Sequence, residues 1–149
     1  MGYTLVATIW EPGPILRAMS EYNVDKIILV REEEDLADSR SQSKKEDSID
    51  IIRNSIEVKE IKTGLNDVYR VASDVFEELK NSDERFIFDV SGGKKPQALG
   101  LIMAASRIPN VEEIIYDAAE DNEFLNIPMF NLEVSEKRKE ILKLVDQGK

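Results

Sequence analysis

The sequence predicts an α/β fold in which six strands form a doubly wound, mainly parallel sheet. Short apolar runs rich in β-forming residues alternate with amphipathic segments, and this order requires crossover helices between parallel strands. Two of the runs, "DKIILV" and "RFIFDV", are almost continuously apolar, as in strands that are buried on both faces. The last two runs have no helical segment between them, which predicts a β-hairpin at one edge of the sheet.

Each element follows from its local pattern. The expected strands are residues 3–10, 25–30, 57–63, 85–90, 112–119 and 123–132, the last interrupted by Pro128. The expected helices, with apolar residues at helical spacing, are residues 15–22, 48–56, 65–80 and 96–107. Residues 31–47 are highly charged and predict a solvated loop, while the alternation in "EVKEIKT" is typical of an edge strand with one wet face. The whole pattern is Rossmann-like.

The chain of 149 residues has the size of one ordinary domain, which we expect to occupy residues 1–132. The remaining residues, 133–149, predict a linker and a C-terminal helix whose N-cap is Ser135. No basic segment followed by an apolar core opens the chain, and no apolar run approaches the ~20 residues of a membrane span. We therefore expect a cytoplasmic protein without a membrane partner.

Composition restricts the chemistry. The chain has no cysteine and no histidine, which excludes disulfides, thiolate or imidazole metal ligands and cysteine nucleophiles. The sequence indicates no metal site and no cofactor. The net charge of −10 argues against a general electrostatic grip on duplex DNA, so direct DNA binding is not expected. A compact anion could still bind in one locally basic pocket.

The segment "DVSGGKKPQ" is the strongest candidate for such a pocket. Gly92 and Gly93 permit a positive φ and close approach of a ligand to the backbone. Pro96 suits the first turn of a helix and should hold Lys95 in an extended conformation. The helix that follows would then aim its free N–H groups at the loop, where Ser91, Lys94 and Lys95 add a hydroxyl and two positive charges. These features favour a phosphate, although neither G-x-x-x-x-G-K-[ST] nor G-x-G-x-x-G is present.

If the two halves of the chain extend the sheet in opposite directions, its first and fourth strands are central neighbours, and ligands bind beyond their carboxyl ends. That places "TIWEPGP" opposite the glycine loop. In it, Trp10 could stack on a base or belong to the core, and Thr8 and Glu11 could contact a ligand. Arg17, in the helix that follows, could be an ordinary surface charge.

Three other interpretations concern the glycine loop and the residues on either side of it. The glycine loop could be only a tight turn with two solvated lysines. Asp89 could simply brace that turn. Gly100, inside the following helix, is expected to permit close packing of the helix on the sheet.

Both segments resemble one known family. "YTLVATIWEPGPILRAMSEYNVDKIILV" resembles the first βαβ unit of CRISPR-associated Rossmann-fold (CARF) domains, and "FDVSGGKKPQALGLIMAA" is similar to their second motif. The tail "NLEVSEKRKEILKLVDQGK" looks like the start of the winged helix that follows the CARF domain in archaeal CRISPR-locus transcription regulators. The alternative is a dimerisation helix of a stand-alone CARF protein. This chain has Trp10 where the family often has glycine.

The resemblance implies a homodimer that binds cyclic oligoadenylate, most often cyclic tetra-adenylate, across its two-fold axis. It implies a sensor of type III CRISPR signalling whose ligand-binding residues are Thr8, Trp10, Glu11, Ser91, Gly92, Gly93, Lys94 and Lys95. The alternative is a metal-independent ring nuclease, in which Lys94 or Lys95 would be catalytic and would stabilise the transition state of attack by a ribose 2′-hydroxyl. A Rossmann protein for a sugar phosphate or a mononucleotide is the third interpretation.

Overall fold

A computed structural model describes residues 2–8, 12–32, 39–64, 66–117 and 123–128, with the backbone alone for residues 39–45. The strands are β1 (Tyr3–Thr8), β2 (Val24–Glu32), β3 (Glu57–Thr63), β4 (Phe86–Asp89), β5 (Val111–Asp117) and β6 (Phe124–Ile127), in the order β3-β2-β1-β4-β5-β6. All neighbouring pairs are parallel except β5 and β6, which are antiparallel. This confirms the doubly wound sheet of six strands and its edge hairpin.

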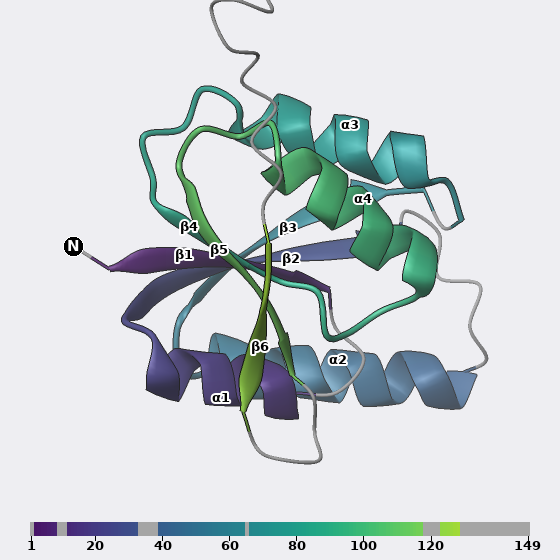
Figure 1. The fold of residues 1–149 in the computed structure, drawn as a ribbon. Helices are drawn as coiled ribbons and strands as arrows, with labels where there is room; N and C mark the ends of the chain where they lie inside the picture. Colours follow the sequence, from purple (N-terminus) through teal and green to yellow (C-terminus); the bar gives the residue numbers. More distant parts are fainter. Residues whose placement is uncertain (1, 9–11, 33–38, 65, 118–122, 129–149) are drawn as a thin grey trace, which may run out of the picture.

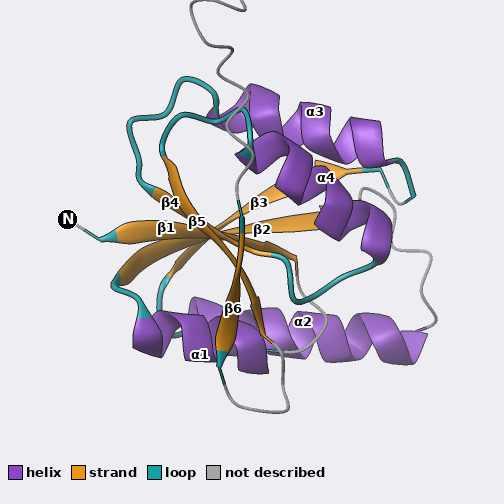
Figure 2. Ribbon diagram, viewed as in Figure 1, coloured by secondary structure: helices purple, strands orange, loops and turns teal. Residues whose placement is uncertain are grey.

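The helices are α1 (Gly13–Glu21), α2 (Ser39–Arg53), α3 (Val68–Leu79) and α4 (Lys95–Ala105). In Figure 1 the helices α3 and α4 cover one face of the sheet, and α1 and α2 cover the other. The colouring by secondary structure in Figure 2 shows the same three layers, with the twisted strands between the two helix pairs.

Alternation along the central strands divides the core between the two faces. In β1, Val6 packs on the α3–α4 side, while Leu5 and Ala7 pack on the α1–α2 side. In β4, Phe86 and Phe88 belong to the first side and Ile87 to the second. Because both faces are covered, these strands need apolar side chains at successive positions, which explains the continuous runs in the sequence.

Two sequence predictions about elements are wrong. Residues 31–47 are not all loop, because β2 continues to Glu32 and α2 begins at Ser39 and ends at Arg53. The first half of α2 offers no apolar stripe from which a helix could be recognised, and the buried isoleucines Ile49 and Ile52 lie near its end.

The second error concerns Gly100, which does not face the sheet. A Cβ at this position would lie 2.6 Å from the side chain of Val71 and 3.0 Å from the carbonyl oxygen of Val68, both on α3. The glycine therefore permits close packing of two helices. The predicted helix after Ser135 lies outside the described residues, and within them no helix has the length and apolar character needed to cross a membrane.

Candidate functional site

The candidate site lies at the carboxyl ends of β1 and β4. These two strands are central neighbours, with Thr4 opposite Phe86 and Ala7 opposite Asp89 in the parallel register. From β1 the chain continues to β2 on one side, and from β4 it continues to β5 on the other. Here the strand order reverses, which is where open α/β sheets bind ligands. The predicted position of the glycine loop is therefore confirmed.

The glycine loop, residues 91–94, leads directly into α4. Gly93 has φ +75°, so the expected positive φ is found at this glycine. Lys94 is the N-cap of α4, with φ −87° and ψ 160°, and its backbone N–H donates to the side-chain oxygen of Gln97 at 3.0 Å. The extended residue is thus Lys94, and Lys95 is already helical. That corrects the prediction for Lys95; Pro96 lies in the first turn, where its missing N–H removes no hydrogen bond.

The loop is fixed from beneath by β1. The buried Thr8 hydroxyl donates a hydrogen bond to the carbonyl oxygen of Gly92. A Cβ on Gly93 would lie 2.8 Å from the Cβ of Thr8 and 2.4 Å from the side-chain oxygen of Gln97. Residues far apart in the sequence therefore meet here as expected. The side chain of Thr8 contacts the backbone of the glycine loop.

Backbone donors are available at the surface of this loop. None of the hydrogen bonds within the described residues uses the N–H groups of Gly92, Gly93 or Lys95. These groups lie at the N-terminus of an 11-residue helix, where the helix dipole favours an anion. Lys94 and Lys95 are both exposed beside them. Chemically, this arrangement can hold a phosphate.

Lys94 has a partner that the sequence did not suggest. Its ammonium nitrogen lies 3.6 Å from a carboxylate oxygen of Glu32, the last residue of β2. The Glu32 side chain is only 8% exposed, whereas that of Lys94 is 47% exposed. Glu32 lies in a run of acidic residues, and no local pattern distinguishes it from them. The pairing of β2 with β1 is what brings the end of β2, and with it Glu32, to the glycine loop.

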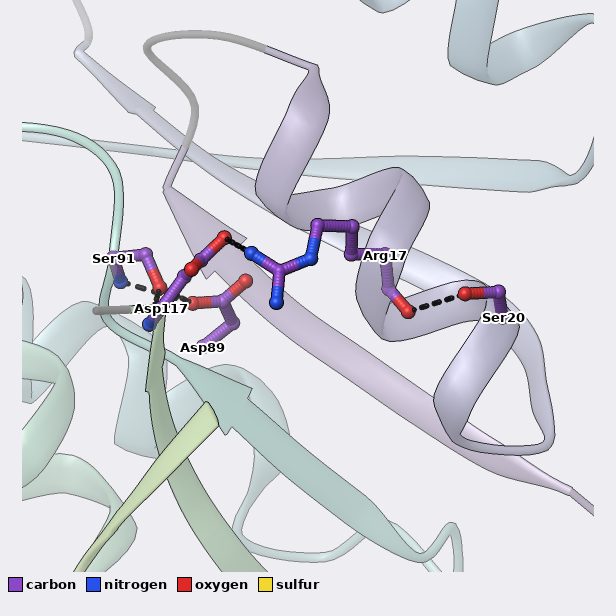
Figure 3. Close-up of polar contacts among 5 residues, drawn as sticks. All are labelled: Arg17, Ser20, Asp89, Ser91 and Asp117. Atoms are coloured by element: carbon purple, nitrogen blue, oxygen red, sulfur yellow. Dashed lines mark hydrogen bonds and ion pairs between the residues drawn. The ribbon is translucent and has the colours of Figure 1, made fainter. Parts of the chain in front are cut away.

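A polar network supports the other side of the loop (Figure 3). The Ser91 hydroxyl and the Ser91 backbone N–H both donate to one carboxylate oxygen of Asp89, and the hydroxyl accepts from the N–H of Asp117 at 2.6 Å. The Ser91 hydroxyl thus joins the ends of β4 and β5. Asp89 does brace the turn, as one interpretation of the sequence held.

Arg17 completes this network from α1, and its interpretation as an ordinary surface charge is wrong. Its guanidinium forms an ion pair with Asp117 and lies 5.1 Å from the centroid of the Phe124 ring. Its other terminal nitrogen and the second oxygen of Asp89 are buried and make no hydrogen bond within the described residues. Arg17 lies in the first of the two segments that resemble the CARF family, but only the fold shows what the arginine contacts.

Burial raises the pKa of one member of this network, the carboxyl group of Asp89. Asp89 is 1% exposed, and desolvation raises its carboxyl pKa above the ordinary value of 3.8. The two hydrogen bonds from Ser91 lower the pKa, and the nearby charge of Asp117 raises it, but desolvation is the largest effect. Trp10 and Glu11, the other predicted ligand residues, lie outside the described residues.

A family model described as "HFX_2341_N:-like, N-terminal" matches residues 6–122, which is more than half of the chain. The chain belongs to this HFX_2341-like N-terminal family. The match spans the elements from β1 to β5, so it includes the glycine loop, Arg17 and Glu32. No curated protein sequence matches this member of the family.

Solved structures with a fold similar to this HFX_2341-like chain include three at low sequence identity. Can2 from Sulfobacillus thermosulfidooxidans in complex with cyclic tetra-adenylate has a TM-score of 0.65 at 16% identity, covering 83% of this chain and 34% of Can2. Csm6 from Enterococcus italicus bound to cyclic hexa-2′-fluoro-hexa-dAMP has a TM-score of 0.65 at 16% identity, and the match covers 97% of this chain and 46% of Csm6. A type III CRISPR defence DNA nuclease activated by cyclic oligoadenylate has a TM-score of 0.59 at 17% identity, and the match covers 85% of this chain and 20% of the nuclease.

The likeness to these structures confirms the α/β, Rossmann-like fold that the sequence predicts. The chain spans between 20% and 46% of the length of these structures.

Proposed function

We propose that this domain is a sensor that binds cyclic oligoadenylate, with cyclic tetra-adenylate as its ring, in type III CRISPR antiviral signalling. The bound ring would regulate an attached or separate effector, or transcription. Support comes from the ligands of its structural neighbours, which include a ring of four and a ring of six nucleotides. Further support comes from the chemistry of the glycine loop, which carries the proposal.

The carrying observation is a concentrated anion site on an acidic chain. Two glycine N–H groups and the N–H of Lys95 lie at the N-terminus of α4 and make no hydrogen bond with any described residue, and two exposed lysines lie beside them. The chain as a whole has a net charge of −10, so a long polyanion is repelled while a compact one is attracted at this point. A small ring of phosphodiesters suits such a site better than duplex DNA does.

In this proposal the two hydroxyl residues support the loop. Thr8 and Ser91 use their hydroxyl hydrogens inside the protein, on Gly92 and Asp89. Gly92, Gly93, Lys94 and Lys95 would contact phosphate. Direct contacts of the adenosines with Thr8, Ser91, Trp10 and Glu11 remain predictions.

The proposal includes a homodimer, in which each protomer presents one glycine loop to a ring with rotational symmetry. An isologous dimer and a symmetric ring repeat the same contacts by rotation. One ring should therefore bind per two chains. A sugar-phosphate or mononucleotide protein would instead bind one ligand per chain, so the stoichiometry separates these two functions.

Calorimetric titration of the full chain with cyclic tri-, tetra- and hexa-adenylate tests the proposal. We expect one tetra-adenylate ring per two chains and a loss of affinity of about tenfold or more in Lys94→Ala and in Lys95→Ala, because each removes a charge-assisted contact to phosphate. Lys80→Ala, which removes an exposed lysine at the end of α3, should bind normally. No binding of any ring by the wild type, or equal binding by all variants, would contradict the proposal.

The same mixtures distinguish a sensor from a ring nuclease. After hours in EDTA with excess protein, a sensor leaves the ring intact. A ring nuclease releases linear products with 2′,3′-cyclic phosphate ends, and Lys94→Ala or Lys95→Ala should then slow their release. Chromatography of the nucleotides measures both results.

A further inference from the structure

Glu32 brings a nearly buried negative charge to the glycine loop. It is the last residue of β2, whereas the loop follows β4, and the end of β1 lies between these strands. Its side chain is 8% exposed, and its carboxylate lies 3.6 Å from the ammonium group of Lys94. A carboxylate that is so little hydrated needs a nearby cation, so Lys94 is partly committed before any ligand arrives.

Among the described residues at the loop, positive and negative charges therefore nearly balance. Lys94 and Lys95 contribute two positive charges and Glu32 removes one. On the other side of Ser91, the charges of Arg17 and Asp117 cancel because the two residues form an ion pair. Asp89 beneath the turn is a carboxylic acid and cannot increase the positive charge. The side chains that these contacts place at the loop thus leave a net charge of at most one unit for a ligand.

We infer that Glu32 determines charge selectivity at this site, favouring the singly charged phosphodiester over the doubly charged phosphomonoester. A phosphodiester carries one negative charge and matches the available balance. A terminal phosphomonoester carries about −1.5 to −2 charges at pH 7, and its additional charge would face the Glu32 carboxylate without a free cation. This inference rests on the proposed function, because it explains how the same loop would distinguish a ring from nucleotides that carry a terminal phosphomonoester.

The test compares two linear nucleotides and the ring. Linear tetra-adenylate with a 3′-phosphate has one phosphomonoester, while the unphosphorylated linear form and cyclic tetra-adenylate contain only phosphodiesters. In Glu32→Gln, the affinity for the 3′-phosphorylated form should rise about tenfold, because removal of the carboxylate frees Lys94. The affinities for the other two nucleotides should change less than about threefold.

Two further variants control for structural effects. Glu32→Asp keeps the charge and should keep the wild-type selectivity. Glu77→Gln removes an equal charge from α3, where Glu77 pairs with Lys80, and should leave all three affinities unchanged. If Glu32→Gln strengthens binding of all three nucleotides equally, Glu32 acts only as a general repulsive charge and the inference is wrong.

Failure of the proposed function would be seen separately. If the ring binds to no variant, that function is wrong, and the selectivity is read from adenosine 5′-monophosphate and its methyl ester, a monoester and a diester of the same nucleoside. Glu32→Gln should then improve the monoester-to-diester affinity ratio by several-fold. An unchanged ratio, or no detectable binding of either probe, would overturn the inference about Glu32.

Discussion

At the scale of single residues, Gly93 shows how the shape of the candidate site is determined. The residue has a left-handed backbone conformation and also lies against Thr8 and Gln97, with no room for a Cβ. The positive φ and the close packing are independent reasons for glycine at this position. Gly93 therefore holds the loop in the conformation in which the N–H groups of Gly92 and Gly93 make no hydrogen bond with the described residues.

Gly93→Ala tests this residue. We expect a loss of about 1–2 kcal/mol in the free energy of unfolding from the left-handed backbone alone, with a further loss from the crowding against Thr8. Urea denaturation measures the change. Gly13→Ala is the matched control, because a Cβ at Gly13 meets nothing within 4 Å. Equal stability of Gly93→Ala and the wild type would show that the loop does not need this conformation.

Other residues show why side-chain roles are harder to predict than positions. Ser91 is expected to line the ligand pocket, and the structure adds a second role, because its hydroxyl connects Asp89 to the N–H of Asp117. Arg17 could have been an ordinary surface charge, but it joins α1 to the end of β5. Both roles depend on partners that are 26 and 100 residues away in the sequence, and no local pattern reports such distances.

At the scale of elements, the packing of α3 on α4 depends on Gly100. The Cβ and a methyl of Val71 occupy the space that a side chain at position 100 would need. Most of the residues of α4 are apolar, so periodicity alone does not indicate which side of the helix faces the sheet. The contact with α3 could therefore be found only in the folded structure.

Gly100→Ala combined with Val71→Ala tests the helix packing. Alone, Gly100→Ala should cost about 1–3 kcal/mol by overpacking, which exceeds the ~1 kcal/mol that alanine gains in helix propensity. In the Val71→Ala background, where the space is free, the same substitution should be neutral or stabilising. A double-mutant cycle from urea denaturation measures the coupling; additive effects would mean that the two positions do not compete for space.

At the scale of the whole molecule, two carboxyl groups at opposite ends of the sheet give opposite pH dependence. Desolvation raises the pKa of Asp89, so the folded state retains this proton to a higher pH than the unfolded state does. The free energy of unfolding therefore falls as the pH rises from 3.8 through the folded-state pKa of Asp89. The hydrogen bond from Lys26 lowers the pKa of Glu84. The contribution of Glu84 to the free energy of unfolding is therefore fully present above pH 4.5 and is lost as the pH falls through its folded-state pKa.

Urea denaturation of Asp89→Asn and Glu84→Gln between pH 3 and 7 measures these contributions. The stability of Asp89→Asn relative to the wild type should increase as the pH rises above 3.8 and then become constant. The stability of Glu84→Gln relative to the wild type should fall as the pH rises through the lowered pKa of Glu84. Parallel curves for Asp89→Asn and the wild type would show that Asp89 titrates normally.

The reversal of strand order between β1 and β4 was only a condition at the level of the sequence, and the structure shows that it is met. The sequence alone determined the α/β class, the hairpin at the edge and the glycine loop between a strand and a helix. These features follow from local periodicity and from the restricted handedness of crossovers, which are written in neighbouring residues. The chemistry of "SGGKK" as an anion site is likewise a property of adjacent residues and the helix that they begin.

Only the tertiary structure decided which charges and hydroxyls meet at that site. Glu32 reaches Lys94 across the end of β1, Thr8 binds the carbonyl of Gly92, and Arg17 pairs with Asp117. Ion pairs and hydrogen bonds depend on distances of a few ångströms between elements. Those distances are set by strand register and helix packing, which no single segment encodes.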